Sequence, residues 1–201
     1  CAPFAVLAAA LFLIPAVVCL RRGQALFARW DGEEEETPEL AGSILNWSLL
    51  WLTAAQLGGF LLFGVAASLA PLGYADPMAL LPAAGEMLFL TLSIIALQRR
   101  VVDLTRRFNP EKQGSVYDLK FRQKWLASCD EAERQRIGQA AYTSYTVTSY
   151  SCLFVWLLLV VINLLAPIGP LPIIAVFIPW ALGQFTYLGQ CIRMETPKRS
   201  R

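Results

Sequence analysis

The chain contains no histidine among its 201 residues, and its cysteines show no CxxC spacing. Histidine and clustered cysteines are the usual ligands of zinc and haem, and histidine is the common acid–base group near neutral pH. We therefore expect no metal site, no cofactor and no catalytic residues of this type. The cysteines are predicted to be buried free thiols rather than disulfides; they lie at positions 1, 19, 129, 152 and 191.

Charged residues are scarce as well. They make up 16% of the chain, whereas 56% of the residues are hydrophobic, which is more apolar than a soluble domain usually is. A helix needs about 20 apolar residues to cross a ~30 Å hydrocarbon core. Segments of this length occupy residues 1–20, 44–70, 78–97, 147–166 and 171–192. The predicted fold is all-α: a polytopic transmembrane helical bundle with five spans, forming a single integral membrane domain over residues 1–201.

The 17 lysine and arginine residues are absent from these apolar segments and fall into three stretches between or after them. Cytoplasmic loops are enriched in lysine and arginine. Five spans place segments 21–43, 98–146 and 193–201 on one side, and inverting the chain would put every basic residue outside. The pattern predicts a multi-pass protein of the cell membrane, with the N-terminus of this chain outside and its C-terminus in the cytoplasm.

The chain begins with Cys1 and is apolar at once. Two interpretations stay open: a lipidated cysteine left by removal of a signal peptide, or the loss of an earlier span. We favour the second interpretation, which gives the full protein six spans and places both of its ends in the cytoplasm.

The two predicted cytoplasmic loops differ in charge. Segment 21–43 has six acidic and three basic residues, and Pro38 is expected to break any helix there. Such a run is typical of a solvated acidic loop, and docking of a basic surface is the alternative. Between Arg99 and Arg136 the second loop has ten basic and six acidic residues.

Segment 98–146 is predicted to form a helical hairpin. The third span should continue along an apolar stripe and end at Asn109-Pro110. The stripe consists of Val101, Leu104, Thr105 and Phe108. A second helix is expected from about Ser115, supported by Asp118 and Arg122 four residues apart.

A third helix of the hairpin is predicted from a capping-box spacing. Ser128 and Glu131 are three residues apart, as in the pair that closes the start of a helix. The helix should then run without a break into the fourth span.

The hairpin also carries the predicted recognition surface. Because it lies beside the bilayer, its basic residues are expected to meet anionic lipid headgroups or a membrane or cytoplasmic protein partner rather than nucleic acid. The surface comprises seven basic residues and one tryptophan: Arg99, Arg100, Arg106, Arg107, Lys120, Arg122, Lys124 and Trp125.

Glu86 is the one charged residue within the predicted spans. Ionisable groups in lipid are costly and often functional, so Glu86 is a candidate for proton or cation handling. The alternative is that Pro77 and Pro82 move the helix start inward and leave Glu86 in the first turn, where the helix dipole favours a carboxylate.

Three amide residues complete the candidate intramembrane polar site, although interhelical hydrogen bonding would also explain them. They are Gln56, Asn163 and Gln184. Pairs of small residues in the second span predict close helix packing, with a homo-oligomer as the alternative. The pairs are Ala54/Gly58, Ala55/Gly59 and Gly64/Ser68.

The sequence resembles one known family at residues 109–112 (Asn-Pro-Glu-Lys), 114–118 (Gly-Ser-Val-Tyr-Asp) and 128–133 (Ser-Cys-Asp-Glu-Ala-Glu). It is similar there to an uncharacterised family of small bacterial polytopic membrane proteins, a domain-of-unknown-function family. The resemblance implies six spans in the cytoplasmic membrane and no established activity. Members are sometimes encoded beside DNA-binding regulators, which implies a regulatory membrane partner.

Two functional hypotheses follow. The first is a non-enzymatic regulatory or accessory membrane protein that acts through its cytoplasmic hairpin. The second is a small transporter or ion- or proton-coupled permease that uses Glu86.

Overall fold

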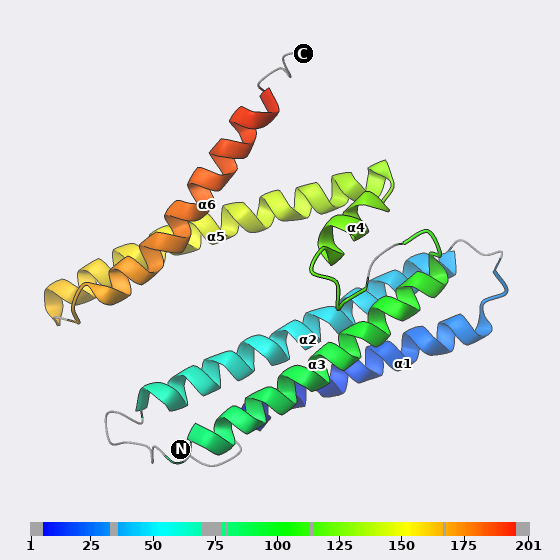
Figure 1. Cartoon of the computed structure of the whole chain (residues 1–201), viewed down its shortest axis with the longest axis horizontal. Helices are drawn as coiled ribbons and strands as arrows, with labels where there is room; N and C mark the ends of the chain where they lie inside the picture. Colours follow the sequence, from blue (N-terminus) through cyan, green and yellow to red (C-terminus); the bar gives the residue numbers. More distant parts are fainter. Residues whose placement is uncertain are drawn as a thin grey trace. The chain divides into compact units, whose positions relative to one another are not determined.

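The computed structural model of the chain describes residues 6–32, 36–69, 78, 80–112, 115–166 and 168–195. These residues form an all-helical structure in which five helices are long and apolar enough to cross a membrane. The all-α class and the five candidate spans are therefore confirmed. In chain order the elements are η1 (Val6–Phe12), α1 (Leu13–Arg29), α2 (Glu36–Leu69), α3 (Leu80–Phe108), α4 (Phe121–Ala127), α5 (Glu131–Leu165) and α6 (Leu171–Glu195) (Figure 1).

The helices form two compact units, residues 1–129 and residues 130–201. The first contains η1, α1, α2, α3 and α4, and the second contains α5 and α6. The single domain over 1–201 stays a prediction.

In the first unit, η1, α1, α2 and α3 pack around one apolar core. The most completely buried large side chains include Leu45 and Leu52 of α2 and Leu90 and Ile94 of α3. The hydroxyl of Ser48 is also buried, and it donates to the Ala16 carbonyl of α1 over 2.8 Å. Burial without this bond would cost free energy, so the contact fixes α2 against α1.

The packed core continues beyond the apolar segments into regions predicted to be loops. Val101, Leu104 and Phe108 are buried, as the apolar stripe predicted. Phe108 contacts Phe27 edge-on, with ring centroids 5.1 Å apart, and lies 5.4 Å from the ring of Trp30. Aromatic pairs of this geometry stabilise packing beyond the area that they bury. The basic ends of α1 and α3 are therefore held together.

The helices also enter the predicted acidic loop 21–43, where the expectation for Pro38 is wrong. Helix α1 reaches Arg29 and α2 begins at Glu36, so Pro38 lies in the first turn of α2. Backbone N–H groups in a first turn have no partner within the helix, so proline removes no helical hydrogen bond there. Residues 33–35 of the acidic run lie outside the described residues.

Two glycines permit the close approach of the helices. A Cβ atom on Gly59 would lie 2.7 Å from Leu90 Cδ2, and one on Gly23 would lie 2.9 Å from Leu45 Cδ2. The predicted packing role of the Ala55/Gly59 pair is thus confirmed within the bundle. A Cβ atom on Gly64 would meet no described atom within 4 Å, so that glycine is not needed for packing in this unit.

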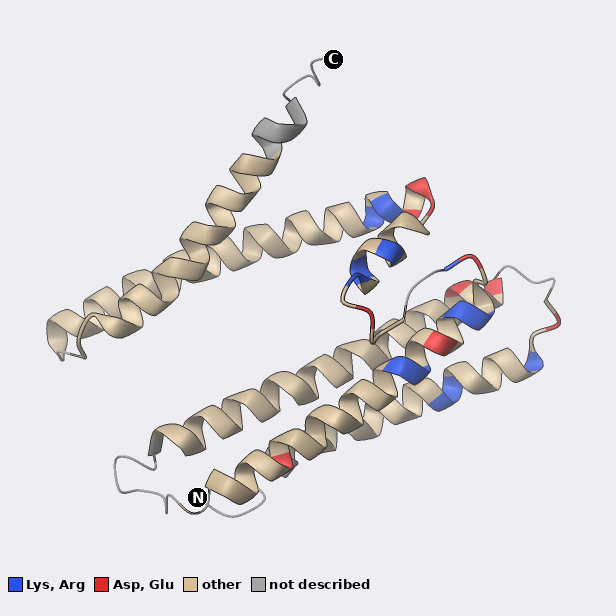
Figure 2. Ribbon diagram, viewed as in Figure 1, with Lys and Arg blue, Asp and Glu red and all other residues tan. Residues whose placement is uncertain are grey.

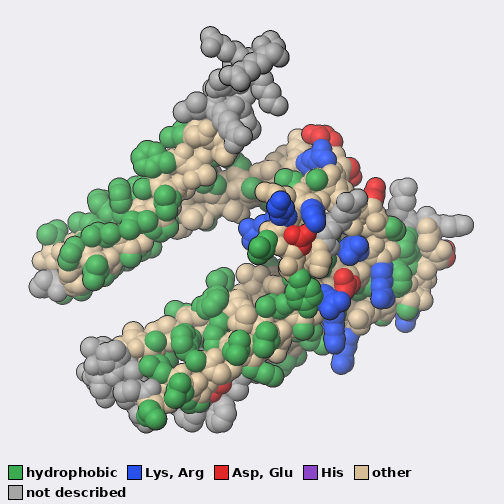
Figure 3. All heavy atoms as spheres, in the orientation of Figure 1, with side chains coloured by type: hydrophobic (Ala, Val, Ile, Leu, Met, Phe, Trp, Pro, Cys, Tyr) green, Lys and Arg blue, Asp and Glu red, His purple; other side chains and the backbone are tan. Residues whose placement is uncertain are grey.

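The second unit is a pair of long helices. Helix α5 runs unbroken from Glu131 to Leu165, as predicted. Its 35 residues span about 52 Å at 1.5 Å per residue, more than a ~30 Å hydrocarbon core requires. No described residue in the most apolar stretches of α5 and α6 is buried, and hydrophobic side chains cover the visible face of the pair (Figure 3). Lipid is the solvent in which such faces are stable.

The start of α5 corrects the predicted capping box. The N-cap is Asp130, whose carboxylate accepts from the Glu133 N–H over 2.7 Å, while the Glu133 side chain accepts from the Asp130 N–H over 3.1 Å. Ser128 lies two residues earlier, and its hydroxyl donates to the Trp125 carbonyl. The box is therefore Asp130/Glu133 and not Ser128/Glu131.

This correction is testable. Asp130→Ala is expected to destabilise the first turn of α5 by about 1 kcal/mol, because the Glu133 N–H loses its acceptor. Ser128→Ala is the matched control and should leave α5 unchanged. Amide hydrogen exchange over residues 131–134 of the full chain measures the difference. Equal protection in the two variants would contradict the assignment.

Candidate functional site

The connector, defined as residues 109–130, joins the end of α3 to the start of α5. Helix α3 ends at Phe108, as predicted from Asn109-Pro110. The Asn109 N–H completes the last turn by donating to the Thr105 carbonyl over 3.0 Å, and the Lys112 N–H donates to the Asn109 carbonyl over 3.1 Å. Residues 113 and 114 lie outside the described residues. Within the rest of the connector the described helix is α4, which begins later than the predicted Ser115.

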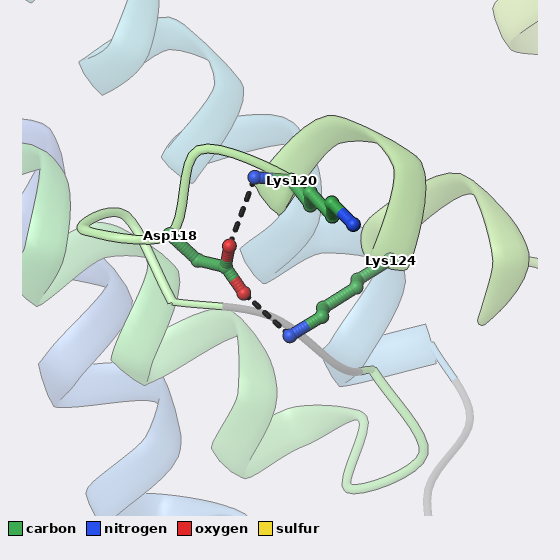
Figure 4. A network of polar contacts seen from close by, with 3 residues as sticks. All are labelled: Asp118, Lys120 and Lys124. Atoms are coloured by element: carbon green, nitrogen blue, oxygen red, sulfur yellow. Dashed lines mark hydrogen bonds and ion pairs between the residues drawn. The ribbon is translucent and has the colours of Figure 1, made fainter.

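Asp118 organises the turn before α4 (Figure 4). Its carboxylate accepts hydrogen bonds from the Lys120 backbone N–H over 2.9 Å and from the Lys124 ammonium group. These bonds, with the Lys124 bond the largest cause, lower the pKa of the Asp118 carboxyl below its ordinary value. Asp118 forms an ion pair with Lys124 and not the predicted pair with Arg122.

Lys112 and Cys129 close the base of the connector. Both residues are buried, and the Lys112 Nζ atom donates to the Cys129 Sγ atom over 3.5 Å. The thiol in turn donates to the Trp125 carbonyl over 3.3 Å. The Arg106 Nε–H donates to the Lys112 carbonyl over 3.2 Å, which anchors this base to the last turns of α3.

The burial predicted for Cys129 is confirmed. Cys19 and Cys152 are also free thiols but only partly buried. The side chains of Cys1 and Cys191 lie outside the described residues.

Several residues of the predicted recognition surface make contacts that hold the connector in place. Arg99 lies with its guanidinium carbon 5.4 Å from the centroid of the Tyr117 ring and pairs with Asp103 over 3.5 Å. The ring of Trp125 packs against Phe121, with centroids 5.5 Å apart. Arg106 and Lys124 make the contacts described above.

The other four members of this surface are exposed; they are Arg100, Arg107, Lys120 and Arg122. In the first unit, the lysine and arginine positions lie along one half of α1 and α3 and around α4 (Figure 2). The connector therefore combines a bonded framework with the exposed residues Lys120 and Arg122, while Arg100 and Arg107 are exposed on α3.

The candidate intramembrane site is only partly assembled in the first unit. The Gln56 side chain of α2 donates to the Thr91 hydroxyl of α3 over 3.3 Å. Glu86 lies in the second turn of α3 and is partly buried. Five residues separate Glu86 from Thr91, which places the two about 140° apart around the helix. Glu86 therefore occupies a different face of α3 from Thr91, the partner of Gln56.

Asn163 belongs to the second unit and stabilises the turn that follows α5. Its side-chain oxygen accepts from the Ile168 N–H over 3.1 Å and from the Gly169 N–H over 3.0 Å. Gly169 has a φ of 82°, which glycine adopts without strain. Asn163 is thus a turn-forming residue in this structure.

Gln184 of α6 lies in a polar cluster with Tyr145 and Ser149 of α5. The Tyr145 hydroxyl of α5 donates to Gln184 Oε1 over 2.6 Å, and Gln184 Nε2 donates to the Ser149 hydroxyl over 3.2 Å. Tyr187 stacks on Tyr145, with ring centroids 4.6 Å apart. Interhelical hydrogen bonding, the alternative stated for the amide residues, thus describes both Gln56 and Gln184.

Across the described ranges, no three histidine, cysteine, aspartate or glutamate residues group closely enough to hold a metal ion. The chain matches no protein-family model, no curated protein and no solved structure.

Proposed function

We propose that the chain is a non-enzymatic integral protein of the bacterial cytoplasmic membrane that regulates or assists a protein partner through its connector. The observation that carries this proposal is the internal bonding of the connector, from Lys112–Cys129 at its base to Asp118–Lys124 at its turn. A surface that is ordered before binding loses less conformational entropy when a partner docks. The exposed arginines and lysines around it favour a partner with acidic groups.

The charge pattern supports a cytoplasmic connector. Arg99 and the basic residues that follow it occur after the apolar part of α3, and lysine and arginine near span ends favour the cytoplasmic side. The resemblance to a bacterial membrane family supports the same location. The six-span form of the full protein remains part of this proposal.

The test is capture of partners from membranes of the source cell after cross-linking. The intact chain is compared with a variant in which residues 115–127 are replaced by a Gly/Ser segment of equal length. We expect one partner to be retained by the intact chain and lost from the variant, with equal membrane insertion of both. Arg136→Gln, an exposed change in α5, is the control and should retain the partner. Equal retention by the replaced connector would contradict the proposal.

A proton- or cation-coupled permease is the second candidate, and the position of Glu86 favours it. Helix α3 begins at Leu80, with Pro82 in its first turn, so Glu86 lies about 9 Å along the helix at 1.5 Å per residue. The first-turn dipole explanation therefore accounts poorly for this carboxyl, because the dipole effect falls off within one turn.

This candidate predicts that Glu86→Gln abolishes coupled flux in proteoliposomes. Glu39→Gln, at an exposed carboxylate near the start of α2, should leave flux intact. Normal flux with Glu86→Gln would exclude the role of this carboxyl in transport.

A further inference from the structure

The connector does not continue away from α3 but turns back beside it (Figure 1). The contact between Arg99 and the Tyr117 ring fixes how far it returns. Arg99 lies nine residues before Phe108, where α3 ends, and this separation is about 14 Å along the axis at 1.5 Å per residue. Tyr117 therefore lies at the level of Arg99, well short of the end of the helix.

The level of Arg99 corresponds to the expected membrane surface. Helix α3 has 29 residues, about 44 Å at 1.5 Å per residue, which exceeds a ~30 Å hydrocarbon core. Its apolar part precedes Arg99 and Arg100, the first basic residues of the helix. Arginine at the end of a span extends its charge to the headgroups, and tyrosine is enriched at the same depth.

Leu119 lies two residues beyond Tyr117 and is fully exposed, with a relative accessibility of 104%. It occupies the turn from Asp118 to Phe121, in which the Phe121 N–H donates to the Asp118 carbonyl over 2.9 Å. An isolated exposed leucine is ordinary on a protein surface. This leucine differs because it follows a tyrosine held at the level of the membrane surface.

The charge around Leu119 suits an anionic surface. Segment 117–124 has three basic residues and one acidic residue. The carboxylate of the acidic residue, Asp118, is bonded to Lys124, whereas Lys120 and Arg122 are exposed. Basic residues beside an apolar anchor are typical of segments that bind anionic bilayers.

We propose that residues 117–122 form a binding site for anionic phospholipid headgroups, with Leu119 inserted between them. Lys120 and Arg122 supply the electrostatic attraction, and Leu119 supplies apolar burial. This inference goes beyond the proposed function, since it concerns a lipid and holds whether or not a protein partner docks. Its consequence is that lipid composition sets the position of the connector.

The test measures water access at position 119 in the full chain. Leu119→Cys is reconstituted in nanodiscs of phosphatidylcholine, with or without phosphatidylglycerol, and labelled with a membrane-impermeant maleimide. Labelling of the parent protein corrects for its own thiols. Glu111→Cys, at an exposed position near the end of α3, is the matched control.

We expect Leu119→Cys to react many-fold more slowly when phosphatidylglycerol is present, and Glu111→Cys to react equally in both nanodiscs. Adding Lys120→Gln and Arg122→Gln should raise the labelling rate in the anionic nanodiscs by up to about thirtyfold, since each basic residue near an anionic surface contributes about fivefold. The Asp118–Lys124 pair stays intact in this variant. Equal rates in the two lipids, or slow labelling that persists after charge removal, would overturn the proposal. Partner capture is a separate measurement, so failure of one proposal does not imply failure of the other.

Discussion

Replacing Gly59 by valine is expected to lower the free energy of unfolding of the first unit by about 1–3 kcal/mol, the usual cost of overpacking a core. The added Cβ atom alone would lie 2.7 Å from Leu90 Cδ2 and 3.3 Å from Met87 Sδ. Leu90 has a relative accessibility of 1%, and side chains in a packed core have little free space into which to move. Relief of the contact therefore requires the Leu90 and Met87 side chains to shift or α2 and α3 to separate.

Gly64→Val is the matched control, because it changes the same residue type in the same helix. A Cβ atom at position 64 meets no described atom within 4 Å, so the two variants share the intrinsic cost of valine in a helix but differ in packing. Titration of the full chain with SDS in mixed micelles, followed by circular dichroism, measures both. A loss of stability that is equal for Gly59→Val and Gly64→Val would show that the close approach contributes nothing.

Several predictions that depend on local sequence were confirmed, although those for Pro38 and for the Ser128/Glu131 capping box were wrong. Apolar length predicted the five candidate spans, because burial of a helix in lipid depends on its own side chains. Asn109-Pro110 predicted the end of α3, since proline lacks the N–H that would continue the helix. The apolar stripe of α3 predicted the buried positions Val101, Leu104 and Phe108.

The predictions for the connector failed where they assumed a continuous helix. A four-residue spacing favoured a pair between Asp118 and Arg122, but α4 begins only at Phe121 and leaves Asp118 in a turn. From that turn Asp118 reaches Lys124 instead. The contact between Lys112 and Cys129 joins residues that are 17 positions apart in the sequence. Its formation depends on the path of the whole connector. No spacing rule identifies such a pair.

The candidate polar site stays a prediction, and its residues make contacts that the sequence did not specify. Hydropathy identifies polar residues in apolar segments but not the direction in which each side chain points. In the structure Gln56 bonds to Thr91, Asn163 closes a turn, and Gln184 bonds to Tyr145 and Ser149. Neighbouring hydroxyl groups of α5 also differ in their partners. The Thr146 hydroxyl donates to the Tyr142 carbonyl of its own helix, whereas the Tyr145 hydroxyl donates to Gln184 of α6.

The difference between bonds within α5 and bonds between α5 and α6 leads to a prediction for the second unit. Gln184→Leu is expected to lower the stability of the α5–α6 pair by about 1–3 kcal/mol, since it removes two interhelical bonds and leaves the Tyr145 hydroxyl without its acceptor. Tyr145→Phe removes one of these bonds and should cost about 0.6–1.7 kcal/mol. Thr146→Val is the control and should have little effect, because the Thr146 bond stays within α5.

The double variant separates a direct bond from two independent effects. If Tyr145 acts through Gln184, then Tyr145→Phe should cost little once Gln184→Leu is present, so the two losses will not add. Reversible unfolding of the full chain by steric trapping, with the traps on α5 and α6, measures each free energy. Fully additive losses would mean that the 2.6 Å contact between the Tyr145 hydroxyl and Gln184 does not couple the two helices. A non-additive result would show that this hydrogen bond couples α5 and α6. Such a bond matters for this pair because none of the described residues in its most apolar stretches is buried.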